Sequence, residues 1–210
     1  MSLASGSGMA HGKSLALQVA DYDSDGLPDV YIASDGEPAD LFHNVGHGWF
    51  ENQSMQTGTA MGMSGEAQAG MGVDFGDYDR DGLLDRVVTT FRNETYSLYD
   101  HTWGTFESAS KESSPGETRH FLGFGTRFFD FDDDTWPDLV FANGHVYNNV
   151  EANEPGVLFR QPTLLFQNQC GTFVRVTPGG QGLRRLSPAA PELPADRKPL
   201  DRGPATGCIR

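Results

Sequence analysis

The stretch GDYDRDGLLD, residues 76–85, places Asp77, Asp79, Asp81 and Asp85 around Gly82. Four carboxylates in nine residues are unfavourable without a partner that neutralises their charge, because like charges held close together raise one another's pKa. Aspartates at positions 1, 3, 5 and 9, with glycine at position 6, are similar to the first part of a calcium-binding loop. Oxygen ligands of this kind favour calcium over transition metals. The alternative is a solvated acidic turn, since Asp and Gly are ordinary turn residues.

The pattern occurs three times, which argues against an accidental acidic turn. DYDSDGLPD occupies residues 21–29 and DFDDDTWPD occupies residues 130–138, so the copies start 56 residues (21 to 77) and 53 residues (77 to 130) apart. A near-constant period of this length indicates a repeat architecture. In the third copy Thr135 stands where the pattern has glycine, which predicts a strained backbone and weaker calcium binding there.

The residues that follow each loop distinguish it from an EF-hand. That loop needs a bidentate glutamate at position 12 and a helix on each side, but position 12 is Ile32, Val88 and Phe141. The runs VYIAS, RVVTT and LVFAN that follow the loops are typical of buried β-strands. The loops are therefore predicted to connect the strands of hairpins.

A second hairpin pattern follows each acidic loop: LFHNVGHGWFEN (41–52), LYDHTWGTFES (98–108) and LFQNQCGTFVRV (165–176). Each period thus contains four short strands, placed in the first repeat near 14–20, 29–34, 40–44 and 48–53. Repeated four-stranded units are typical of propeller blades. We predict an all-β fold, a partial β-propeller of three four-stranded blades at about 14–56, 71–112 and 124–177. Residues 1–13 are predicted to be a disordered lead and residues 178–210 a disordered Pro/Arg-rich tail.

The segments GMGVDFGDYDRDGLLDRVVTTFRNETYSLY and GFGTRFFDFDDDTWPDLVFANGHVY resemble the VCBS and FG-GAP repeats of integrin α-like β-propellers. Within that group the chain is most similar to the bacterial ASPIC/UnbV-type and cartilage acidic protein-like family, over about residues 14–177. The resemblance implies up to three Ca²⁺ ions, each held by the aspartates of one loop and by the carbonyl oxygen at position 7. The implied metal ligands are Asp21, Asp23, Asp25, Leu27, Asp29, Asp77, Asp79, Asp81, Leu83, Asp85, Asp130, Asp132, Asp134, Trp136 and Asp138.

The number of repeats departs from this family. Propellers close with roughly 4–8 blades, whereas three are found here, so we expect an open arc with exposed blade faces. A fragment, a truncated gene or a frame-shifted gene would each explain this, and the sequence does not choose among them.

Composition and sequence pattern restrict the expected binding partners and the expected cellular location of the protein. The net charge of −14 argues against nucleic acid, since phosphate binding needs basic patches. No run approaches the roughly 18 apolar residues of a membrane span. Calcium loops of modest affinity fill best outside the cell, so an extracellular or periplasmic location is expected. Residues 1–14 lack the apolar region of a signal peptide, which implies that the signal was removed or that export has been lost.

No catalytic or cofactor-binding residues are predicted. Ser7 stands where a phosphate-binding loop would need glycine, and G-x-S-x-G is missing from the sequence. The segments GMG (70–72) and GFG (123–125) are interpreted as places of close backbone packing. His43 and His47 flank one turn and could share a metal, but we interpret them as surface residues. The aromatic side chains, Trp49 and Trp103 among them, are interpreted as core between blades.

The leading hypothesis is a calcium-binding, non-enzymatic module for binding or adhesion in an exported protein, with an unidentified protein or glycan ligand. One alternative is a domain of a glycan-binding or glycan-cleaving protein, which predicts an acid or histidine in a closed pocket. Another is self-association, or completion of the propeller by another chain through exposed edges. The long segment 144–163 is the best candidate for a partner-binding loop.

Overall fold

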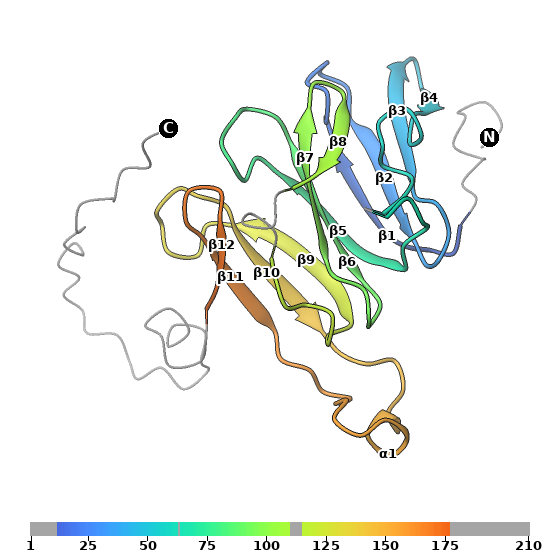
Figure 1. Cartoon of the computed structure of the whole chain (residues 1–210). Helices are drawn as coiled ribbons and strands as arrows, with labels where there is room; N and C mark the ends of the chain where they lie inside the picture. Colours follow the sequence, from blue (N-terminus) through green and yellow to red (C-terminus); the bar gives the residue numbers. More distant parts are fainter. Residues whose placement is uncertain (1–11, 63, 110–114, 177–210) are drawn as a thin grey trace, which may run out of the picture.

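The computed structural model describes residues 12–62, 64–109 and 115–176. These residues form three four-stranded antiparallel sheets in which strands adjacent in sequence are adjacent in space (Figure 1). The strands are β1 (Ser14–Ala20), β2 (Asp29–Ser34), β3 (Asp40–Gly46), β4 (Trp49–Asn52), β5 (Gly70–Gly76), β6 (Asp85–Thr90), β7 (Ser97–Thr102), β8 (Thr105–Ser108), β9 (Gly123–Phe129), β10 (Asp138–Asn143), β11 (Leu164–Asn168) and β12 (Phe173–Arg175). The prediction of an all-β fold with three four-stranded blades is confirmed.

The blades are arranged around their first strands. β5 packs against both β1 and β9, so these three strands form the inner wall of the arc, and the later strands of each sheet fan outwards (Figure 1). Within each sheet every strand pairs antiparallel with the next one in sequence. This is the blade order of a β-propeller, present here as a partial ring of three blades.

Glycines allow the close approach of inner strands. A Cβ added to Gly72 would lie 2.9 Å from the Cα of Gly125, and one added to Gly123 would lie 2.6 Å from Oη of Tyr96. The hydroxyl of Thr89 accepts a hydrogen bond from the Gly72 amide (2.9 Å) and donates one to the carbonyl of Gly123 (2.8 Å). The interpretation of GMG and GFG as sites of close backbone packing is therefore confirmed.

The core between the first two blades contains a buried cation that the sequence did not indicate. Arg86 is only 1% exposed, and its guanidinium carbon lies 4.2 Å from the ring centroid of Tyr99 and 4.7 Å from that of Tyr31. Its Nη1 donates to the carbonyl of Thr59 at 3.1 Å. Aromatic faces attract a desolvated guanidinium, so the rings compensate part of the cost of burying this charge.

The aromatic residues divide between core and surface. Phe141 is buried between the second and third blades, as predicted, and Phe166 packs against it in the same core. Trp49 and Trp103 are instead 53% and 90% exposed, because both lie at the outer hairpin of their blade. The prediction that these two residues form core is wrong.

One face of the first blade is exposed and apolar. The side chains of Leu15, Leu17 and Val19 are 53%, 63% and 52% exposed and lie on one face of β1. Ala16 lies on the opposite face, which packs towards the second blade. The prediction that a three-blade arc exposes a blade face is confirmed.

The strand bounds predicted for the first repeat agree with the structure to within two residues. The acidic loops connect antiparallel strands, as expected for hairpins and not for an EF-hand. Segment 144–163 contains the short helix α1 (Val150–Asn153), which is labelled in Figure 1. An ion pair between Glu154 and Arg92 joins this segment to the second blade. The predicted tail at 178–210, and the predicted lead up to residue 11, lie outside the described residues. The described part of the chain contains no helix with the length and apolar character needed to cross a membrane.

Candidate metal centres

The three acidic loops share one hydrogen-bonded scaffold, built on the carboxylate at position 1. In the first loop, Asp21 accepts hydrogen bonds from the amides of Asp25 (3.0 Å) and Gly26 (2.9 Å). The corresponding distances are 3.0 and 3.0 Å in the second loop and 3.1 and 2.8 Å in the third. The carboxylate at position 5 in turn accepts from the amide at position 7, at 2.8 Å in every loop. Aspartate is suited to these positions because its short side chain reaches nearby backbone amides.

Two positions of each loop have left-handed backbone conformations. At position 6, φ is +88° for Gly26, +92° for Gly82 and +76° for Thr135. A positive φ is a genuine outlier for a β-branched residue, so the predicted strain at Thr135 is confirmed. Position 4 is also left-handed in all three loops, with φ of 61–65°, although the sequence pattern gave no signal for it.

The aspartate at position 9 is buried and connects the loop to the third strand of its blade. In the second loop, Asp85 is 2% exposed and accepts hydrogen bonds from the amides of Tyr78 (3.1 Å) and His101 (2.9 Å). Asp29 and Asp138 make the equivalent pairs of bonds. The sequence predicted these aspartates as ligands only. The structure adds that both oxygens of each one satisfy buried backbone amides.

Burial makes the charged form of these carboxylates costly. Desolvation raises the pKa of Asp85 to about 8, and repulsion from Asp79 and Asp100 adds to this effect. Desolvation likewise raises the pKa of Asp138 to about 6, with Asp132 and Asp134 contributing repulsion. A bound divalent cation would stabilise the charged carboxylates.

The carboxylates converge in the geometry expected for a cation site. In the second and third loops, oxygen atoms from positions 1, 3 and 9 lie within 4.8 Å of one another; these groups are Asp77, Asp79 and Asp85, and Asp130, Asp132 and Asp138. An all-oxygen donor set of this kind fits a hard cation such as Ca²⁺. Asp81 and Asp134 lie outside these groups and accept the backbone bonds described above. The carbonyl oxygens of Leu27, Leu83 and Trp136 stay predicted ligands.

The first loop is arranged differently. Its carboxylates divide into two groups that share Asp23: one contains Asp21, Asp23 and Asp25, and the other contains Asp23, Asp29 and His43. The side chain of His43 is 15% exposed, and its Nδ1 lies 3.1 Å from Oδ1 of Asp29. The interpretation of His43 as a surface residue is therefore wrong. His47 is exposed in the turn with a φ of +54° and belongs to neither group.

The residue that faces position 3 from the third strand differs among the blades. In the first blade this residue is His43. In the second it is Asp100, which lies close enough to Asp79 for their charges to repel and which accepts a hydrogen bond from the hydroxyl of Tyr78 at 2.5 Å. In the third it is Gln167, whose Nε2 donates to Oδ2 of Asp132 at 2.6 Å. The three loops thus share a scaffold but differ in one neighbouring side chain.

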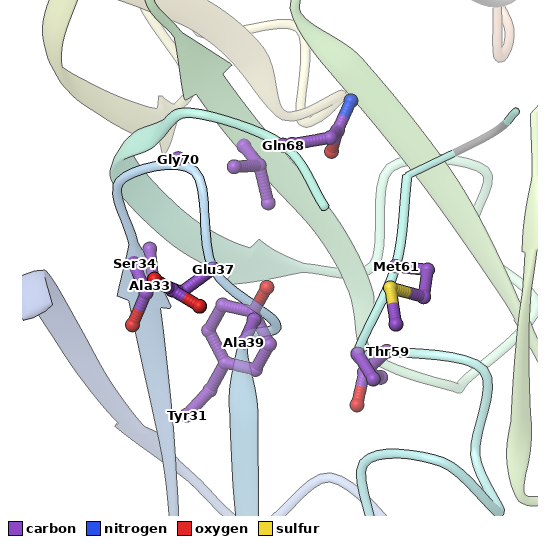
Figure 2. A pocket seen from close by; sticks show the side chains of 11 residues that line it. Tyr31, Ala33, Ser34, Glu37, Ala39, Thr59, Met61, Gln68 and Gly70 are labelled. Carbon is purple, nitrogen blue, oxygen red and sulfur yellow. The ribbon is translucent and has the colours of Figure 1, made fainter. Parts of the chain in front are cut away.

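A small cavity lies between the first two blades, at the end of β2 away from the acidic loop (Figure 2). Its volume is about 10 Å³, which is room for about one water molecule. Gln68 lines it and is held by hydrogen bonds with Tyr99 (3.0 Å) and Ser97 (2.8 Å). A cavity of this size is too small for a sugar ring, so this site does not provide the pocket that a glycan-cleaving enzyme would need.

Three tandem four-stranded blades with an acidic loop at the same place in each define a repeat protein of the β-propeller class. A family model described as an FG-GAP-like repeat matches residues 21–88, which span the first two acidic loops. Residues 21–88 therefore match the FG-GAP-like repeat family, in agreement with the resemblance found in the sequence.

One curated relative supports the same resemblance. The chain is 31% identical over 143 residues to cartilage acidic protein 1 of Mus musculus, a match that covers 65% of this chain and 20% of the relative. The chain thus spans about one fifth of the length of that protein. Among solved structures, a lectin of Agrocybe aegerita, described as recognising non-reducing terminal N-acetylglucosamine, aligns with a TM-score of 0.42 and 19% identity. That alignment covers 76% of this chain and 36% of the lectin.

Proposed function

We propose that the chain is a calcium-binding, non-enzymatic repeat module that serves binding or adhesion in an exported protein. The observation that carries the proposal is the convergence of three carboxylate oxygens within 4.8 Å in the second and third loops, on a backbone scaffold shared by all three. Carboxylates at this separation repel one another, and a divalent cation would remove the repulsion.

In this proposal calcium stabilises each blade at the junction of its first three strands. The loop connects the first strand to the second, and the aspartate at position 9 bonds to the amide of the third. A cation held by positions 1, 3 and 9 therefore links all three strands at one end of the sheet. The binding surface itself lies elsewhere on the blades, and its partner is a protein or a glycan.

The similarity to FG-GAP repeats and to cartilage acidic protein 1 supports a location outside the cytoplasm. Calcium loops of modest affinity fill in extracellular fluid, where the ion is abundant. In this proposal the loop carboxylates with raised pKa values hold cations, and a bound cation would remove their capacity for acid–base catalysis.

The test is a thermal melt of the full chain in excess EGTA and again in millimolar calcium. A cation that binds only the folded state, at about 100 times its dissociation constant, adds roughly 2.7 kcal/mol per site, so a clear rise in Tm is expected. A calorimetric titration should give up to three sites. An unchanged Tm together with no heat of binding would overturn the proposal.

Variants locate the effect in the loops. Asp79→Asn and Asp81→Asn keep an oxygen that can accept the loop hydrogen bonds but remove a charge, so each should lower the calcium-induced rise in Tm. The matched control is Asp133→Asn, which also removes one loop charge, at the left-handed position 4 that is no predicted ligand. Equal losses in all three variants would point to net charge alone as the cause.

A further inference from the structure

We propose that the first blade carries a site for a first-row transition metal ion such as Zn²⁺, with Asp23, Asp29 and His43 as ligands. The inference rests on the proposed function, since it assumes that the acidic loops hold divalent cations. It adds that one of the three loops has a different metal preference, which is determined by a side chain outside the loop.

The geometry of His43 carries the proposal. Its Nδ1 lies 3.1 Å from Oδ1 of Asp29 and 3.4 Å from Oδ2 of Asp23. One ring nitrogen carries at most one proton, so it cannot donate a strong hydrogen bond to both carboxylates. A metal ion placed among Nδ1 of His43 and the two carboxylate oxygens could be bound by all three atoms at once.

The surroundings hold the ring in place. The imidazole packs edge-on against Tyr22, with ring centroids 6.0 Å apart and an interplanar angle of 79°. Asp29 is fixed by the amides of Tyr22 and Asn44, at 3.2 and 2.7 Å. Two of the three ligands are therefore oriented by bonds and contacts that do not depend on the metal, as is usual for protein metal sites.

Comparison of the blades makes the site specific to the first one. The equivalent of His43 is Asp100 in the second blade and Gln167 in the third, and neither offers an imidazole. Oxygen-only sets suit calcium, whereas imidazole nitrogen suits zinc and its neighbours in the first transition row. Two carboxylates and one histidine also match the three protein ligands of an open zinc site, which leaves a fourth position for water.

The two ligand groups of the first loop compete because they share Asp23. When a transition metal takes Asp23 and Asp29, the group Asp21, Asp23 and Asp25 loses one carboxylate. We therefore expect zinc to displace calcium from the first loop while the other two loops keep it. Calcium stoichiometry should fall by one when one equivalent of Zn²⁺ is added.

The experiment is a titration of the metal-free full chain with Co²⁺, a spectroscopic substitute for zinc, followed by displacement with Zn²⁺. The variant His43→Gln places the residue of the third blade in the first. His47→Gln is the matched control, because His47 lies on the same hairpin outside the ligand group. The expected result is one Co²⁺ site with visible absorption. Its affinity should fall in His43→Gln by more than the roughly tenfold that loss of an outer-shell partner costs, and it should be unchanged in His47→Gln.

Two outcomes overturn the inference: Co²⁺ binding with the same affinity and spectrum in His43→Gln, or no Co²⁺ and Zn²⁺ binding by the unmodified chain. A parallel calcium titration of the same proteins separates the two proposals. If calcium still binds while Co²⁺ and Zn²⁺ do not, only this inference fails. If the unmodified chain binds no calcium at all, the proposed function fails, whatever the Co²⁺ result.

Discussion

Asn168 in the third blade donates a hydrogen bond from Nδ2 to the carbonyl oxygen of Tyr78, 2.8 Å away in the acidic loop of the second blade. The same amide group donates to the carbonyl of Pro137 in its own blade at 2.9 Å, and Oδ1 accepts from the amide of Gly171 at 2.8 Å. One buried side chain thus joins two neighbouring acidic loops. Asn44 occupies the same position in the first blade but bonds only within that blade, to Pro28 and Gly46.

Asn168→Ala is expected to lower the free energy of unfolding by about 3 kcal/mol, because it leaves buried backbone groups without partners. Asn44→Ala should cost less, about 1 kcal/mol, since Asn44 is more exposed and makes no bond between blades. Urea unfolding of both variants measures the difference. Equal losses would mean that the bond to Tyr78 adds nothing to stability.

Gly123→Ala is expected to destabilise the protein by about 1–3 kcal/mol through overpacking. The added methyl group would meet Tyr96 at 2.6 Å and Thr89 at 2.7 Å, where the second and third blades pack together. Gly125→Ala is the control in the same strand, because no atom lies within 4 Å of its Cβ position. Thermal melts of the pair check this, and similar Tm values for both would contradict close packing as the reason for Gly123.

Thr135→Gly is expected to stabilise the metal-free protein by about 1 kcal/mol. The φ of +76° strains a β-branched residue, whereas glycine adopts it freely and occupies the equivalent positions 26 and 82. Calcium affinity of the third loop should also rise, because less strain remains in the conformation that binds. Chemical denaturation in EGTA and calorimetry in calcium measure the two effects. The reverse change, Gly82→Thr, should lower both quantities in the second loop.

Stability should depend on pH through Asp74, a buried residue that links the second and third blades. Its Oδ2 accepts from the amide of Phe128 at 2.7 Å and its Oδ1 from Nη1 of Arg127 at 3.1 Å. Burial raises the pKa of this carboxyl above its usual value of 3.8, although these bonds oppose the shift. The folded state therefore keeps a proton that the unfolded chain has lost, and the contribution of Asp74 to stability falls as pH rises from about 4 through the raised pKa.

Urea unfolding of the native protein and of Asp74→Asn across this pH range checks the sign. The native protein should lose stability relative to the variant as pH rises. Arg127→Met should steepen the loss, because the positive charge of Arg127 holds the pKa of Asp74 down. A constant difference between native protein and Asp74→Asn would show that Asp74 titrates alike in both states.

The sequence predicted those features that depend on local chemistry. The spacing of Asp77, Asp79, Asp81 and Asp85, repeated in two other places, identified the loops and the hairpins that contain them. The missing glycine at Thr135 predicted a strained backbone, which the structure contains. These predictions succeeded because turn chemistry and strand alternation act over only a few residues.

Apart from the close packing at Gly72 and Gly123, features that depend on contacts between distant segments were not predicted. Arg86 directly follows an acidic loop and gave no signal of burial, because its aromatic partners Tyr31 and Tyr99 come from two blades. The sequence does not indicate that His43 lies beside Asp29, because the two residues are 14 positions apart and belong to different strands of the blade. For the same reason the sequence does not predict that the position-9 aspartates accept hydrogen bonds from backbone amides, since each of these amides belongs to another strand.

The exposed apolar face of β1 determines what kind of assembly the blades could form. That face turns away from the second blade, while Phe129 and Ala142 lie exposed on the third blade at the other end of the arc. The two surfaces belong to different repeats and differ in composition. Contact between them in two molecules is therefore heterologous, and it adds subunits in one direction. Such contacts produce a closed ring or an open filament with polarity, and not a two-fold symmetric dimer.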